Sequence, residues 1–248
     1  MSYNKLQLSK YDSDYHDRQY ANPYQSTINF CDWLVEIGAI GAENIRICDL
    51  GCGKGANLYY MSKRFPHCSF VGLDIDEQLI NDGRKIMQKN AVDNCSLSVG
   101  DLHRAGSYFN KGEFSGIISL QTLSWLQGYE KAFDAIISLS PRWIAITSLF
   151  YDGPIEAKIV VTEFDISQKG DVKKALFYNT YSLPLVRQYF FDRGYRQFKY
   201  IPFEIPIDLP RNKDGRMQTY TEKIIDGRRL QISGPLLMNW FFIYVAKE

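Results

Sequence analysis

Apolar residues along the first 150 positions follow two alternating patterns. Segments near 22–38 and at 54–65, 77–90 and 129–139 place apolar residues every three or four positions, as amphipathic helices do. Short continuous apolar runs, typical of buried strands, occur at 45–50, 68–75, 95–101, 114–120 and 142–150. The alternation of strand and helix predicts an α/β fold with a doubly wound, mostly parallel sheet and helices on both faces.

This rhythm breaks after residue 150. Further elements are expected at 158–166 (an alternating run), 183–193 (a helix before Gly194), 195–207 (a strand whose prolines indicate an edge or a bend), 219–233 (a hairpin around Asp226-Gly227) and 236–246 (a closing buried strand).

The chain shows no repeat and no composition shift typical of a linker. We therefore expect a single domain over residues 1–248. Residues 1–22 form an N-terminal flap in this interpretation, and insertions at 151–181 and 207–234 form a lid over a substrate.

Net charge, cysteine content and the lengths of apolar segments indicate which partners and which cellular location to expect. The formal net charge is +1, so no nucleic acid partner is expected. The five cysteines are odd in number and form no CxxC pair, which favours reduced thiols in a cytoplasmic protein and no metal site. The polar N-terminus is unlike a signal peptide, and the apolar stretch 236–246 is too short to span a bilayer as a helix, so no membrane partner is expected.

The segment "DLGCGKG" at 49–55 directly follows the first strand of the alternating core. Glycines at alternate positions let the backbone turn sharply and let a ligand approach closely, and the next helix offers N–H groups at its start. Dinucleotide enzymes use the spacing G-x-G-x-x-G, whereas this loop reads G-x-G-x-G beside Asp49. A carboxylate there would repel pyrophosphate and would suit a ligand with a positive amine, such as S-adenosylmethionine.

Two further carboxylates end the next two strands. Asp74 ends "VGLDID", where an acidic residue can accept hydrogen bonds from ribose hydroxyls. Asp101 ends "VGD" and can take an adenine amino group, with Leu102 offering an apolar surface. Three carboxylates at successive strand ends are costly without a ligand that uses them.

The ordered segments "ICDLGCGKG", "VGLDID", "VGD" and "FSGIISLQTLSWL" resemble the motifs of class I S-adenosylmethionine-dependent methyltransferases over roughly residues 22–150. The resemblance implies a seven-stranded Rossmann-like sheet whose last strand is antiparallel, with S-adenosylmethionine as cofactor and S-adenosylhomocysteine as product. It implies a cofactor site in which Asp49, Gly51 and Gly53 surround the methionine part, Asp74 the ribose, and Asp101 and Leu102 the adenine. The other residues expected at the cofactor are Cys52, Ile75, Gln121, and Tyr15 and Tyr20 of the flap.

Two histidines are candidates for a catalytic base. His103 lies two positions after Asp101, and His16 lies in the flap. A histidine near its ordinary pKa suits the deprotonation of a hydroxyl, whereas transfer to an amine needs only proximity and alignment. Aromatic residues after the fourth and fifth strands and in the lid are the expected substrate contacts: Trp125, Phe150, Tyr151, Tyr178, Tyr181 and Trp240.

The sequence thus predicts a methyltransferase that acts on an oxygen or nitrogen of a small molecule or a sugar or glycan precursor, as a monomer or homodimer. One alternative is an NAD-dependent oxidoreductase with a Rossmann fold, which the glycine spacing and Asp49 disfavour. The other is a non-catalytic scaffold that keeps the cofactor-binding loop.

Overall fold

The computed structural model describes residues 18–165, 171–211 and 217–247. The chain forms two compact units, each with its own internal contacts. The first contains the described residues up to Leu120, together with Tyr129–Ile146 and Lys247. The second contains Gln121–Gly128 and Thr147–Ala246. The expectation of a single domain with a lid remains a prediction.

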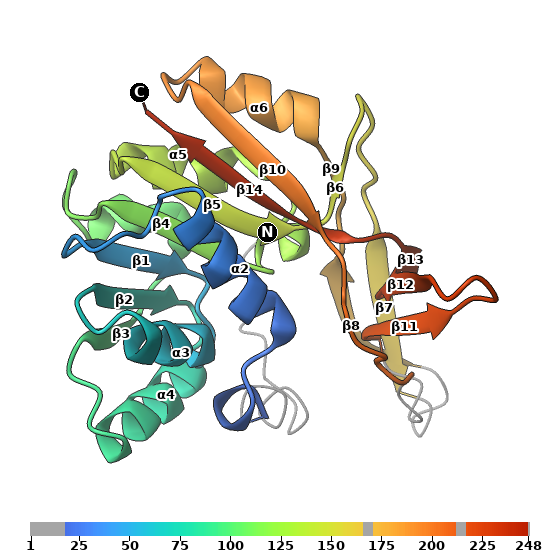
Figure 1. Cartoon of the computed structure of the whole chain (residues 1–248), viewed down its shortest axis with the longest axis horizontal. Coiled ribbons are helices and arrows are strands. Elements are labelled where there is room, and N and C mark those ends of the chain that lie inside the picture. The colour runs from blue at the N-terminus through green and yellow to red at the C-terminus, as the bar shows by residue number, and fades with distance from the viewer. Residues whose placement is uncertain (1–17, 166–170, 212–216, 248) are drawn as a thin grey trace. The chain divides into compact units, whose positions relative to one another are not determined.

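Seven strands form one sheet in the order β10-β14-β5-β4-β1-β2-β3 (Figure 1). The pairs β1–β2, β1–β4 and β2–β3 are parallel, whereas β10 and β14 are antiparallel. The strands are β1 (Arg46–Leu50), β2 (Ser69–Asp74), β3 (Cys95–Val99), β4 (Gly116–Leu120), β5 (Trp143–Ser148), β10 (Gln197–Phe203) and β14 (Trp240–Ala246). This sheet confirms the predicted fold class, including the edge position of the proline-containing strand β10.

Helices follow the predicted segments closely. They are α2 (Gln25–Glu36), α3 (Ala56–Arg64), α4 (Glu77–Lys89), α5 (Glu130–Ser138) and α6 (Leu183–Phe191), with short 3-10 helices η1 (Leu102–Ser107) and η2 (Leu123–Trp125). Their ends have local causes. The Asp76 carboxylate accepts a hydrogen bond from the Leu79 amide and caps α4, and Ser182 caps α6 in the same way through Leu185.

The core of the first unit is formed by buried strands. The side chains of Ile47 and Cys48 in β1 and of Ile117 and Ile118 in β4 have no exposed surface. Close packing explains a glycine here: a Cβ atom on Gly116 would lie 2.1 Å from the indole of Trp143. Glycine at this position therefore lets β4 and the tryptophan of β5 come together.

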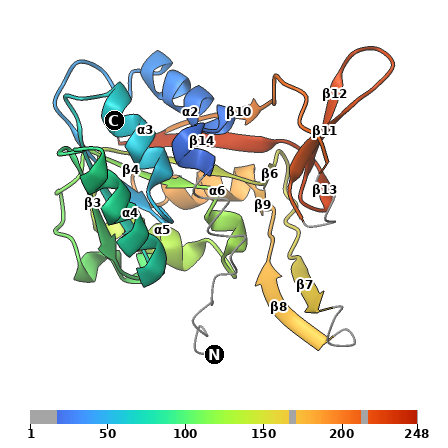
Figure 2. The ribbon, with the colours of Figure 1, turned by 90° about the horizontal axis from the view of Figure 1, so that it is seen from below.

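The second unit adds three small sheets. They contain β6 (Phe150–Tyr151) with β9 (Tyr181–Ser182), β7 (Val160–Asp165) with β8 (Asp171–Phe177), and β11 (Thr219–Lys223), β12 (Arg229–Ser233) and β13 (Leu236–Leu237). The antiparallel strands β7 and β8 run side by side in Figure 2. The hairpin of β11 and β12 confirms the turn predicted at Asp226-Gly227, where Gly227 has a φ of 84°.

The prediction of one continuous closing strand at 236–246 is wrong. Residues Leu236–Leu237 pair with β12, and a separate strand, β14, begins at Trp240. The Ser233 hydroxyl donates a 2.8 Å hydrogen bond to the Met238 carbonyl between these strands. In the part of the chain that the structure describes, no helix is long and apolar enough to cross a membrane.

Candidate functional site

The loop between β1 and α3 is built on three glycines in the left-handed region. Gly51, Gly53 and Gly55 have φ values of 85°, 55° and 84°. The amides of Gly51 and Cys52 both donate to the Leu73 carbonyl in β2, at 2.8 and 3.1 Å. Residues with a Cβ atom rarely adopt such positive φ angles, so the glycines are needed for this loop to form.

The carboxylate of Asp74 holds the same loop from the end of β2. Its Oδ2 accepts a 2.7 Å hydrogen bond from the Gly53 amide, and its Oδ1 accepts one of 2.9 Å from the Asp76 amide. Burial raises the pKa of Asp74, and the two amides partly offset this rise. A carboxylate has about four acceptor positions, so the Asp74 oxygens retain capacity for a ligand hydroxyl.

The carboxylate of Asp49 is buried and unsatisfied. Its side chain has no exposed surface, and neither Oδ1 nor Oδ2 has a hydrogen-bond partner among the described residues. Burial raises the pKa of Asp49 well above its ordinary value, and the nearby charge of Asp74 raises it further. An unpaired buried carboxylate is unfavourable, so this position calls for a proton or for a cationic ligand.

Cys52 contributes its backbone to the loop. Its thiol is buried, and a Cβ atom on Gly72 in β2 would lie 2.6 Å from that sulfur. Burial and then the charges of Asp49 and Asp74 raise the thiol pKa well above its ordinary value. The side chain therefore packs beneath the loop as a neutral thiol, so only the main chain of Cys52 remains for the predicted cofactor contact.

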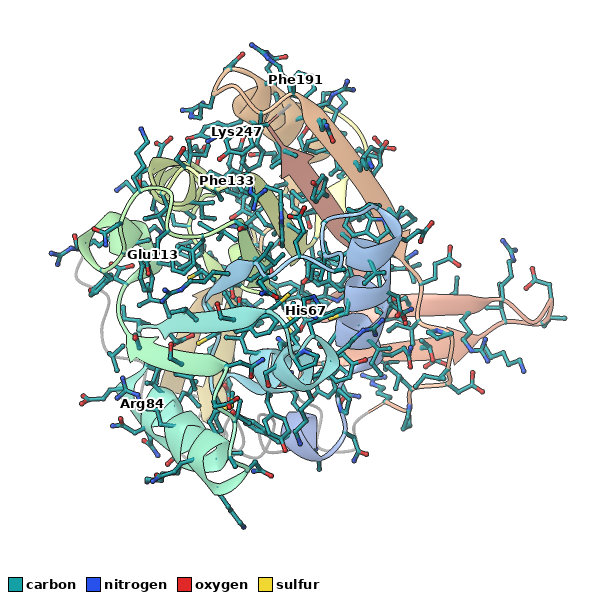
Figure 3. All side chains as sticks on the ribbon, turned by 60° about the vertical axis from the view of Figure 1, so that its left-hand side comes forward. His67, Arg84, Glu113, Phe133, Phe191 and Lys247 are labelled. Atoms are coloured by element: carbon teal, nitrogen blue, oxygen red, sulfur yellow. The ribbon has the colours of Figure 1, made fainter. Side chains whose placement is uncertain are left out.

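Two contacts converge on the carbonyl of Lys54, in the same loop. The Tyr20 hydroxyl donates a hydrogen bond to it. From α4, Gly83 approaches so closely that a Cβ atom there would lie 2.1 Å from the carbonyl oxygen. The neighbouring Arg84, labelled in Figure 3, donates from Nε to the Leu97 carbonyl of β3 at 3.0 Å. The contact of Gly83 with the loop was not predicted, although a glycine on the apolar face of a helix is a signal of close packing.

Asp101 and His103 form a pair after β3. The Asp101 Oδ1 atom lies 3.0 Å from Nδ1 of His103 and accepts a 2.9 Å hydrogen bond from the His103 amide. This aspartate therefore orients the histidine and caps η1. Beside these strand ends, Ile75 is 61% exposed, and Leu102 is half-buried, so both have apolar surface to offer a ligand.

The sheet order places the glycine loop at a topological switch point. The chain passes from β1 to β2 and β3 on one side, and then returns to β4 on the other side of β1. Open α/β sheets bind ligands at the carboxyl ends of the strands where this reversal occurs. Asp49, the loop and Asp74 all lie at this edge in the first unit.

The predicted substrate residues differ in exposure within the second unit. Trp125 is 36% exposed and Tyr151 is 47% exposed, whereas Phe150 and Tyr181 have no exposed surface. The predicted contact of Phe150 and Tyr181 with a substrate does not fit this burial. Tyr178 is buried between two tryptophans, with ring centroids 5.0 Å from Trp125 and 6.4 Å from Trp240.

Tyr181 instead joins Asn179 in a buried hydrogen-bond network around residues 123–127. The Tyr181 hydroxyl lies 3.0 Å from the Leu126 carbonyl. Asn179 donates from Nδ2 to the same carbonyl at 2.9 Å and accepts from the Ile159 amide at 3.0 Å. This network lies directly after Gln121, which has an unusual φ of 57°. Gln121 stays a predicted cofactor or substrate contact.

Two predicted residues, Tyr15 and His16, lie outside the described residues. Tyr20 is described, and its hydroxyl reaches the Lys54 carbonyl of the glycine loop. Among the residues that the structure describes, no group of three or more His, Cys, Asp or Glu side chains could hold a metal ion.

Part of the chain that includes this site matches a known protein family. Residues 42–153 match a family described as a methyltransferase domain. The uncharacterized protein RP028 of Rickettsia prowazekii (strain Madrid E) is 30% identical over 114 residues, which are 43% of this chain and 43% of that protein. The chain spans less than half the length of the curated relatives it matches.

Solved structures show the same fold. Magnesium protoporphyrin IX methyltransferase from Synechocystis PCC 6803, with bound S-adenosylhomocysteine, has a TM-score of 0.55 and 14% identity, over 99% of this chain and 91% of that chain. A S-adenosylmethionine-dependent methyltransferase from Aquifex aeolicus has a TM-score of 0.54 and 15% identity, over 95% and 98%. The family match over residues 42–153 agrees with the resemblance found in the sequence, and these structures confirm the fold that the resemblance implies.

Proposed function

We propose that this chain is a class I S-adenosylmethionine-dependent methyltransferase that transfers a methyl group from S-adenosylmethionine to an oxygen or nitrogen of a small molecule or a sugar or glycan precursor. The observation that carries the proposal is the buried carboxylate of Asp49, which has no partner among the described residues and lies beside three left-handed glycines. The cofactor's ammonium group would supply the positive charge that this carboxylate lacks.

The other residues of the first unit fit the remaining parts of the cofactor. Asp74 is held in place by two amides and retains acceptor capacity for ribose hydroxyls. Asp101 and the apolar surfaces of Ile75 and Leu102 would receive the adenine. We assign the loop main chain at Gly51, Cys52 and Gly53 to the methionine part.

The protein's part in catalysis is to bind and orient the reactants. When bound, the cofactor supplies an electrophilic methyl group on a cationic sulfur. For a nitrogen acceptor, proximity and alignment of the attacking atom are sufficient, and these can lower a barrier by several kcal/mol, about 7–11 kcal/mol in favourable cases. For an oxygen acceptor a base is required. His103, which Asp101 orients through Nδ1, and His16 are the proposed bases.

An aromatic platform in the second unit supports a small-molecule acceptor. Trp125 offers a partly exposed ring and is backed by Tyr178, which in turn contacts Trp240 edge to face. Rigid aromatic surfaces of this kind bind planar or sugar-like groups at a low entropic cost. The magnesium protoporphyrin methyltransferase, by its name, also acts on a small molecule. We propose Trp125 and Tyr151 as the contacts that reach the acceptor.

Titration calorimetry with S-adenosylhomocysteine and, separately, NAD tests the proposal. The protein should bind S-adenosylhomocysteine and not NAD. Asp49→Ala should remove this binding while the circular dichroism spectrum stays unchanged. Asp93→Ala, at an exposed position in the connection between α4 and β3, is the matched control. Binding of NAD without S-adenosylhomocysteine would indicate an oxidoreductase instead.

Transfer itself is tested by incubating the protein with methyl-labelled S-adenosylmethionine and a panel of small-molecule acceptors. Label in an acceptor from the parent, and none with Asp49→Ala, would support the enzyme assignment. Saturable cofactor binding with no transfer to small molecules, proteins or RNA would favour the scaffold alternative.

A further inference from the structure

The residue Tyr20 contacts the glycine loop at the point where it turns into α3. Its hydroxyl donates a hydrogen bond to the main-chain carbonyl of Lys54. Its ring meets the ring of Tyr59, one turn into α3, edge to face with centroids 5.1 Å apart. Tyr20 thus touches both the last part of the loop and the helix that follows it.

The Lys54 carbonyl is held from a second direction by α4. Gly83 leaves no space there, since a Cβ atom on it would lie 2.1 Å from the carbonyl oxygen and 3.0 Å from the carbonyl carbon. The peptide between Lys54 and Gly55 therefore lies between the Tyr20 hydroxyl and the backbone of α4. Gly55, with a φ of 84°, is the N-cap of α3.

This peptide sets the direction in which the first amides of α3 point. Those amides have no partner within the helix and form the part of the loop that can face a ligand. The side chain of Tyr59 is fixed in turn, because Lys63 lies over its ring at 4.0 Å and donates to its hydroxyl. The ring that supports Tyr20 is thereby anchored within α3 itself.

We propose that Tyr20 is a positioning residue that keeps the Lys54–Gly55 peptide in the orientation in which the loop receives the cofactor. This inference rests on the proposed function for the identity of the ligand. It assigns Tyr20 a role through the loop main chain, in place of the expected direct contact of its side chain with the cofactor. Restricting the loop before binding lowers the entropic cost of binding.

The test compares Tyr20→Phe with Tyr60→Phe. The first change keeps the ring against Tyr59 and removes the hydroxyl. The control removes the hydroxyl of Tyr60 in α3, which accepts a 3.0 Å hydrogen bond from Arg64 of the same helix. Both side chains are half-buried, so both variants should fold, which apo melting curves verify.

Two measurements are made on each variant: S-adenosylhomocysteine affinity by calorimetry, and amide hydrogen exchange of peptides spanning residues 51–59 without ligand. Loss of one neutral hydrogen bond that holds the loop should weaken affinity about fivefold in Tyr20→Phe. Exchange in 51–59 should become faster, with the rest of the protein unchanged. Tyr60→Phe should leave both quantities within about twofold of the parent.

The inference is overturned if Tyr20→Phe binds S-adenosylhomocysteine as tightly as the parent, or if Tyr60→Phe weakens binding equally. A parent that does not bind S-adenosylhomocysteine contradicts the proposed function instead. Hydrogen exchange then still decides whether Tyr20 holds the loop: unchanged exchange in 51–59 overturns the positioning role, and faster exchange supports it.

Discussion

The amide of Gly53 donates a 2.7 Å hydrogen bond to the carboxylate of Asp74. This bond joins the loop after β1 to the end of β2, so the residue expected to bind ribose also holds the loop expected to receive the methionine part. Binding and loop geometry are therefore coupled through one side chain.

Replacing Asp74 by alanine should weaken S-adenosylhomocysteine binding by at least tenfold. The change removes the acceptor for the Gly53 amide and any charge-assisted hydrogen bonds to the ligand, each worth about 1.5–3 kcal/mol. Calorimetry gives the affinity, with Asp93→Ala as control. Equal affinities of Asp74→Ala and the parent would show that Asp74 does not contact the cofactor.

Replacing Asp49 by asparagine should stabilise the apo protein increasingly as the pH rises. Burial, followed by the charge of Asp74, raises the folded-state pKa of Asp49 above its unfolded value. The folded state then binds the proton more tightly, so the stability linked to this group is present below about pH 3.9 and is lost as the pH rises through the folded pKa. A neutral amide cannot lose a proton in this way.

Melting curves of the parent and Asp49→Asn from about pH 5 to about pH 8 test whether the stability difference between them grows with pH. A gain of about 1 kcal/mol corresponds to roughly 2–4 °C in a chain of this size. The same variant should lose S-adenosylhomocysteine binding, because the anionic partner for the ammonium group is gone. A melting difference that shrinks as the pH rises would contradict the interpretation.

Replacing Gly83 by alanine should both destabilise the protein and weaken cofactor binding. The new methyl group would collide with the Lys54 carbonyl, and overpacking of this kind costs about 1–3 kcal/mol. Gly41→Ala is the matched control, since a Cβ atom there meets nothing within 4 Å. Denaturant unfolding and calorimetry provide the two readouts. If both variants behave alike, Gly83 is not a close-packing requirement.

Replacing Asn179 by alanine should lower the free energy of unfolding by about 1–3 kcal/mol, because the half-buried Ile159 amide loses its side-chain acceptor and the Leu126 carbonyl loses one of its donors. Asn81→Ala, on the exposed side of α4, should change it by less than about 0.5 kcal/mol. Urea unfolding monitored by tryptophan fluorescence measures both. A cost for Asn179→Ala no larger than for Asn81→Ala would show that the network is dispensable.

Short-range sequence patterns were sufficient to predict most of the secondary structure of the first unit. Apolar runs located β1 to β5 in the sequence, and Asp226-Gly227 marked a hairpin. In the second unit the same sequence patterns predicted the strand boundaries less well. The division of the closing segment into β13 and β14 depends on pairing with β12, a contact between segments that periodicity does not encode.

The sequence by itself determined the sheet, the glycine loop and the acidic residues at three strand ends, because apolar period and turn chemistry act over a few neighbouring positions. Only the tertiary structure decided what those residues touch. It buried the Asp49 carboxylate where no described residue pairs with it, joined Asp74 to Gly53, and brought Tyr20 and Gly83 to one carbonyl. Such contacts join segments distant in the chain, and burial and hydrogen bonding between them arise only when the core packs.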